Sequence, residues 1–291
     1  MKRTSLLILG AMMFLCGSTA VAQVVDEDQE VTNRDSFYEV QNSNKAKKPF
    51  VYPYVRSADV VWQHRVWRVV DFREKMNQPF YYPQGDEGLQ GRVNLFNVLD
   101  KAIKDGTIKV YADDEFTTEV DYAKLLESAG DKKLETKYRY NVDNMEEEYE
   151  EETYIAMNPM DVKSMRIKED WYIDKQRSVR DVRIIGFSLI YMKARGEGEP
   201  AQPYPLGWIC YNEPEVRNLL ANAEMYNPKN DVERRSFDDV FVKRMFTSYI
   251  IRESNVPNRS VSEYLTGMDA LFESQSIEEE LFNMEQDMWE Y

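Results

Sequence analysis

The chain has 291 residues, of which 43% are hydrophobic and 13% aromatic. This composition is typical of a globular protein, because a disordered chain lacks enough apolar side chains to build a core. Its 52 acidic and 37 basic side chains give a net charge of −15. We therefore expect no nucleic-acid partner, since binding to phosphates requires clustered lysine and arginine. A basic protein partner is compatible with this charge.

The first residues have the three parts of a secretory signal peptide. A basic pair precedes an apolar stretch over residues 6–15, and an Ala-Val-Ala cleavage signal occupies residues 20–22. The apolar stretch is much shorter than the roughly 20 residues of a membrane-spanning helix. Cys16 follows a leucine rather than the small residue expected before a lipidated cysteine. We predict a signal peptide over residues 1–22 and an exported chain with no membrane anchor.

Residues 23–56 are polar and charged, which predicts a flexible N-terminal arm. A helix is predicted over residues 57–76, where apolar residues recur at helical spacing. Its large aromatics and arginines exceed what one buried face accommodates, and such side chains are enriched at interface centres. Packing within the monomer is the alternative. The candidate partner-interface residues are Trp62, Trp67, Arg68, Asp71 and Arg73.

The middle of the chain predicts mixed structure. Helices are expected over residues 94–105 and 121–129, with a short strand over 107–111 between them. The glutamate-rich run of residues 146–152 predicts a solvated surface insertion, since like charges disfavour compact structure. A divalent-cation site is the alternative, although the run lacks the glycine and ligand spacing of a calcium loop. The strands predicted next form an antiparallel meander over residues 166–174, 181–192 and 206–212.

The last third predicts helices. One begins near residue 213, one at Ser236 and continues through residue 250, and one at Ser260. A final acidic helix from Ser276 has a narrow apolar stripe. That stripe is a candidate docking surface, with packing on the parent domain as the alternative. The stripe residues are Ile277, Leu281, Met284 and Met288.

The fold class predicted from this pattern is α+β, with a short antiparallel central sheet flanked by helices. A core domain is expected over residues 57–265 and an acidic helical tail over residues 266–291.

Catalytic chemistry has little support. His64 is the one histidine of the chain, and Cys210 lies in a predicted strand with no basic neighbour to activate its thiol. Glycine-rich phosphate loops and nucleophile motifs are missing from the sequence. We therefore expect no enzymatic activity, metal site or cofactor. A periplasmic envelope hydrolase that uses a carboxylate pair is one alternative, and a free periplasmic binding protein is another.

Several blocks of sequence, in the same order, resemble the gliding-motility protein family called GldN or PorN. The blocks are Val61-Trp62, Val66 through Asn77 with Tyr82-Pro83, Leu95 through Leu99, Gly106 through Tyr111, Ile167 through Trp171, Arg183 through Gly186, Ser236 through Phe241, and Tyr249 through Asn255 with Arg259. The resemblance covers roughly residues 57–265.

The resemblance implies a non-enzymatic subunit of the type IX secretion system of Bacteroidota. Such a protein lies in the periplasm and forms a ring, through self-association, with an outer-membrane lipoprotein of the GldK or PorK type. The lipoprotein would hold it at the inner face of the outer membrane. Contact with inner-membrane motor subunits of the GldL and GldM type is also implied. The ring would support protein secretion and, in gliding species, motility.

Overall fold

The computed structural model describes residues 47–85, 88–89, 91–129, 132–140, 146–154, 157–193, 201–230 and 232–287. The predicted signal peptide lies outside these residues, as do the predicted arm up to residue 46 and Met288. Residues 43–291 form one compact unit.

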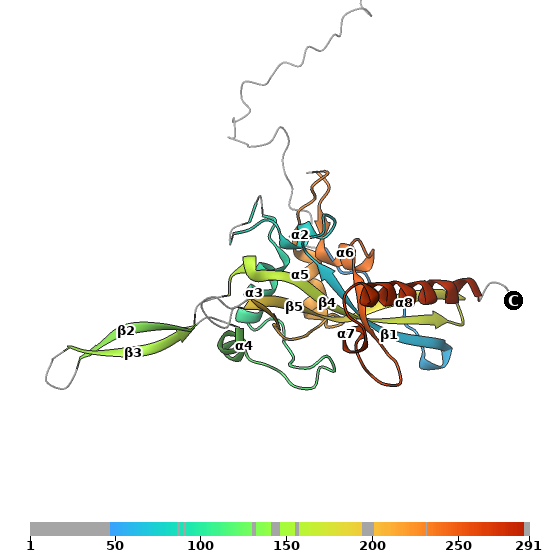
Figure 1. Ribbon diagram of the computed structural model, residues 1–291. Coiled ribbons are helices and arrows are strands. Elements are labelled where there is room, and N and C mark those ends of the chain that lie inside the picture. The colour runs from blue at the N-terminus through green and yellow to red at the C-terminus, as the bar shows by residue number, and fades with distance from the viewer. Residues whose placement is uncertain are drawn as a thin grey trace, which may run out of the picture. The chain divides into compact units, whose positions relative to one another are not determined.

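The strands and helices follow one another as Figure 1 shows. Their bounds are η2 (Ser57–Asp59), β1 (Val60–Asp71), α2 (Gln78–Tyr81), α3 (Leu95–Lys104), α4 (Tyr122–Ala129), β2 (Lys132–Tyr140), β3 (Glu146–Tyr154), η3 (Pro159–Asp161), β4 (Val162–Asp174), β5 (Val179–Lys193), β6 (Gln202–Pro205), β7 (Ile209–Cys210), α5 (Pro214–Asn222), β8 (Glu224–Met225), β9 (Arg235–Ser236), α6 (Phe237–Val242), β10 (Tyr249–Glu253), α7 (Val261–Tyr264) and α8 (Met268–Asp287).

The main sheet is antiparallel and has the strand order β10-β1-β4-β5-β6, with β7 also pairing with β5. The long strands β1, β4 and β5 form its centre. Strands β2 and β3 pair only with each other, and so do β8 and β9. With helices packed beside the sheet, this architecture confirms the predicted α+β class.

The predicted helix over residues 57–76 is wrong, because Val60–Asp71 is strand β1. Its sequence is rich in β-branched and aromatic residues, which favour extended backbone. The five residues from Val66 to Val70 are all buried, so the strand is covered on both faces. A strand buried on both faces has no alternation of apolar and polar residues. The helical spacing of its apolar residues was therefore coincidental.

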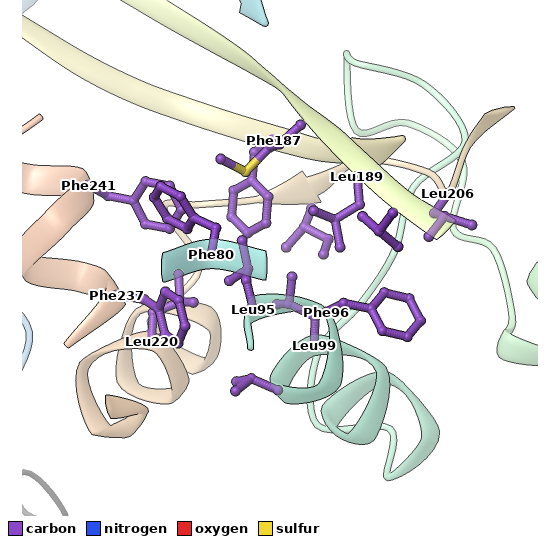
Figure 2. Close-up of a cluster of buried hydrophobic side chains, with 14 of the residues drawn as sticks. Phe80, Leu95, Phe96, Leu99, Phe187, Leu189, Leu206, Leu220, Phe237 and Phe241 are labelled. Atoms are coloured by element: carbon purple, nitrogen blue, oxygen red, sulfur yellow. The ribbon is translucent and has the colours of Figure 1, made fainter. Parts of the chain in front are cut away.

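The main hydrophobic core lies between the sheet and helices α2, α3, α4, α5 and α6, and Figure 2 shows part of it. The ring of Phe241 in α6 stacks with Phe80 of α2 and with Phe187 of β5. The ring centroids are 5.6 Å apart in both pairs. Leu95 of α3 and Leu220 of α5 are also fully buried. Burying each such side chain contributes roughly 1.5–3 kcal/mol. This cluster holds the helices against the sheet.

Several predicted elements are confirmed. Helix α3 begins after Asn94, whose side chain accepts a hydrogen bond from the backbone of Asn97 at 2.8 Å. Strands β4 and β5 pair as the predicted meander requires, and their register shifts between Ile184 and Gly186, which marks a bulge in β5. A capping box opens α6 at Ser236, and another opens α7 at Ser260.

Other boundaries differ from the prediction. Residues 107–111 form no strand, and Tyr111 makes only isolated bridges with Glu119 and Trp208. The helix predicted to continue through residue 250 ends at Val242, and Arg244 then takes a left-handed conformation with φ +52°. Tyr249–Glu253 is strand β10. The final helix, α8, begins at Met268 rather than at Ser276.

The glutamate-rich run forms strand β3. Its partner β2 carries four basic residues in nine, and the register places Arg139 opposite Glu147 but Glu135 opposite Glu151. The two strands form a sheet of their own, separate from the main sheet. That the run is a solvated surface insertion stays a prediction.

Candidate interaction surface

A buried ionic centre lies on β4 at Glu169, a carboxylate with no exposed surface. Arg244 donates to both of its oxygens, at 2.9 and 3.1 Å, and the indole of Trp171 donates at 3.2 Å. The Nε of Arg68 lies 3.4 Å from Oε2 without hydrogen-bond geometry. A buried charge is tolerated only when it is paired and hydrogen-bonded, as Glu169 is.

Arg68, a predicted partner-interface residue, is therefore part of the interior. Its side chain is 3% exposed, and it joins the ionic centre to α8 through a 2.9 Å hydrogen bond to Glu278. The ring of Trp171 lies 5.6 Å from the same guanidinium. The structure assigns Arg68 to internal packing, because β1 places it on the face that α8 covers.

The other predicted interface residues are not gathered on one surface. Trp67 is buried and donates its indole N–H to Asp114 at 3.0 Å. Trp62 is half-buried beside the ring of His64. Asp71 and Arg73 form an ion pair after the end of β1, and Arg73 keeps the pKa of Asp71 below its usual value. Alternation along a strand separates residues that a helix would have brought together.

Two residues of the predicted docking stripe on α8 pack internally. Ile277 and Leu281 are each 5% exposed and contact Val66, Trp171 and Ile250. Met284 is partly exposed, and Met288 lies outside the described residues. The exposed large apolar side chains of α8 are a different set, namely Met268, Leu271, Phe272, Phe282 and Met284. Figure 1 shows α8 beside the sheet that its buried residues contact.

A groove of about 600 Å³ lies where β1 and β10 meet the segment around α7 and the start of α8. Trp67 and Arg252 stand opposite each other in the register of these two strands, and the guanidinium lies 4.3 Å from the indole. Trp208, Arg166 and Leu271 also line the groove. Tryptophan and arginine are the side chains most enriched where proteins bind one another.

A second ionic centre was not predicted from the sequence. Arg217 of α5 donates to Asp238 of α6 at 2.7 Å, and the hydroxyl of Tyr211 donates to the same oxygen at 2.7 Å. Arg217 also donates to the backbone oxygen of Phe50 at 2.7 Å, and Lys47 pairs with Asp239. Residues 47–50 are thereby held against α5 and α6. The sequence signal available for it was the acidic pair Asp238-Asp239 at the start of α6.

The residues suited to catalysis are engaged in structural contacts. His64 lies 3.2 Å from Glu253, and burial raises the pKa of the Cys210 thiol, which disfavours the reactive thiolate. Within the described ranges, no cluster of three or more histidine, cysteine, aspartate or glutamate residues is arranged to hold a metal ion. None of the helices described is both long and apolar enough to cross a membrane.

Comparison with known protein families identifies the chain. The family model described as gliding motility associated protein GldN matches residues 55–290. The matched region begins before β1 and extends through α8, so it includes both ionic centres and the groove. No curated protein matches the chain.

Proposed function

Because the chain belongs to the GldN family of gliding motility associated proteins, we propose that it is a non-enzymatic structural subunit of the type IX secretion system. In this proposal it lies in the periplasm and forms a ring with an outer-membrane lipoprotein of the GldK or PorK type. It also contacts inner-membrane motor subunits of the GldL and GldM type, and it supports protein secretion and gliding motility.

The observation that carries the proposal is the family match over residues 55–290. Two structural features support a binding role. The groove beside β10 combines Trp67 and Trp208 with Arg166 and Arg252, which is the side-chain chemistry of interface centres. The fully buried Glu169 fixes the strands and helix around it, so the surface they present is rigid.

The proposal is tested by deleting the gene for this chain and measuring protein export and surface spreading. We expect the deletion to abolish export of proteins that depend on this secretion system, and a plasmid copy of the chain to restore it. The same strain carrying a plasmid without the gene serves as the control. Normal export and normal spreading in the deletion strain would contradict the proposed role.

A further inference from the structure

Two arginines of the groove beside β10 have donor groups without a partner. The side chain of Arg166, half-buried on β4, makes no hydrogen bond or ion pair with any residue in the described parts of the chain. The Nε of Arg252 is buried without a hydrogen-bond partner, although its guanidinium stacks on Trp67 and contacts Asn258. Leaving a buried donor unsatisfied is costly, so Arg252 favours an acceptor, and the unpaired guanidinium of Arg166 favours an anionic one.

The carboxylates near these arginines already have partners. Asp114 accepts from the indole of Trp67 at 3.0 Å and lies 3.5 Å from the ammonium of Lys168. Glu263 belongs to the capping box of α7, where the backbone and hydroxyl of Ser260 hold it and lower its pKa. Arg252 adds a weaker attraction to Glu263 from the side. The groove therefore combines two arginines with two carboxylates that other groups already hold, on a chain whose net charge is −15.

The groove also has apolar walls. Trp208 is half-buried, Tyr249 is 37% exposed, and Leu271 of α8 is 51% exposed. Its volume of about 600 Å³ lies in the range of ligand-binding sites, roughly 300–1,000 Å³. A site with cations and aromatic walls suits a ligand that carries carboxylates beside a bulky apolar group.

We propose that this groove binds a short acidic segment of a partner protein, with an aromatic residue between its carboxylates. The carboxylates contact Arg166 and Arg252, and the aromatic ring lies against Trp208 and Leu271. A short segment is favoured over a nucleic acid or an anionic membrane, because the chain's overall negative charge repels an extended polyanion. The inference names the chemistry of one partner and rests on the proposed binding role.

The test is fluorescence anisotropy on the purified exported chain. The probe is a labelled peptide that alternates glutamate with phenylalanine, and the control peptide has lysine for each glutamate. We expect the acidic peptide to bind and the lysine peptide not to bind. Arg166→Gln should lower the affinity for the acidic peptide by about tenfold or more, since a charge-assisted hydrogen bond is lost. The matched variant Arg56→Gln removes an exposed arginine outside the groove and should leave binding unchanged.

A second variant keeps the test decisive if Arg166→Gln unfolds the chain. Leu271→Glu adds a negative charge at the exposed rim of the groove on α8. It should weaken binding of the acidic peptide and leave the melting temperature of the chain unchanged. Three outcomes would each overturn the inference. The two peptides could bind equally well, the acidic peptide could fail to bind, or the groove variants could bind it as tightly as Arg56→Gln does. If deletion of the gene still abolishes export, any of these outcomes refutes the groove assignment without contradicting the proposed role in secretion.

Discussion

Glu169 is the residue on which the interior of the sheet depends most. It lies at the centre of β4, and the groups that hold it come from β1, from β4 itself and from the turn after α6. Two charged partners and an indole donor satisfy the carboxylate, but the Nε of Arg68 has no hydrogen bond of its own. The arrangement is sensitive to loss of the carboxylate, because Arg244 would then lose its counter-charge and Arg68 would keep only Glu278.

Replacing Glu169 by alanine should therefore destabilise the fold by about 3–5 kcal/mol, because Arg244 would lose its counter-charge and the buried Arg68 would keep only the exposed Glu278. Chemical denaturation of both proteins measures this difference. The control is Glu278→Gln, which removes the other carboxylate that Arg68 contacts. Since Glu278 is 53% exposed, we expect that variant to cost under about 1 kcal/mol. Similar losses in the two variants would show that the buried centre has no special role.

The ionisation of Asp239 should make the stability of the fold depend on pH. Burial raises its pKa, but the hydrogen bonds from Lys47 and Ser236 outweigh that effect and leave the pKa below its usual value. A carboxyl with a depressed pKa stabilises the folded state above its unfolded pKa, near 3.9, and this stabilisation is lost as the pH falls through the folded value.

The difference in melting temperature between the unmodified protein and Asp239→Asn should therefore be largest near pH 6 and shrink below about pH 4. Thermal unfolding at pH 6, 5, 4 and 3 measures it. A difference that stays constant over this range would contradict the assignment of the ionised carboxylate to the contact with Lys47.

At the level of elements, the bulge in β5 depends on a glycine that has no room for a side chain. A Cβ at Gly186 would lie 2.5 Å from the ring of Phe116 and 2.8 Å from the backbone oxygen of Ile209. Gly186→Ala should cost about 1–3 kcal/mol, since the backbone of β7 must shift. Gly106→Ala is the comparison, because that site is open and only its positive φ of 66° is strained. We expect the smaller loss there, of about 1 kcal/mol, in the same denaturation experiment.

Helix α8 is attached to the sheet mainly through one narrow face. Leu281→Ala should destabilise the protein by about 2–5 kcal/mol, because its side chain is 5% exposed against the second hydrophobic cluster. The neighbouring Phe282 is 54% exposed, and Phe282→Ala should change the stability by under about 0.5 kcal/mol. Urea denaturation gives both values. Equal effects would mean that α8 is not packed as described.

The sequence predicted helices better than it predicted strands in this protein. Helices α3 and α6 have side-chain caps, and α5 has a proline in its first turn. These signals act within about ten residues. Strand β1 has no such boundary signal, because tertiary contacts on both faces decide its conformation. Strand β3 pairs with β2, which lies outside its own sequence.

For the whole molecule, the family could be identified from the sequence, whereas the candidate site could not. Short blocks of residues carried the resemblance, and the match over residues 55–290 confirms it. The groove combines β1, β4 and β10 with loops near residues 114 and 208 and with α8. These segments are distant in sequence. In addition, the wrong prediction of a helix over residues 57–76 assigned Trp67 and Arg68 to one interface, although they lie on opposite faces of β1.

We propose that this chain works as one subunit of a larger assembly. The measurement that tests this is the native mass of the particle obtained when the tagged chain is purified from envelope extract in mild detergent. We expect a large particle that contains several copies of the chain together with a lipoprotein. Recovery of the chain as a monomer, without a lipoprotein, would contradict it.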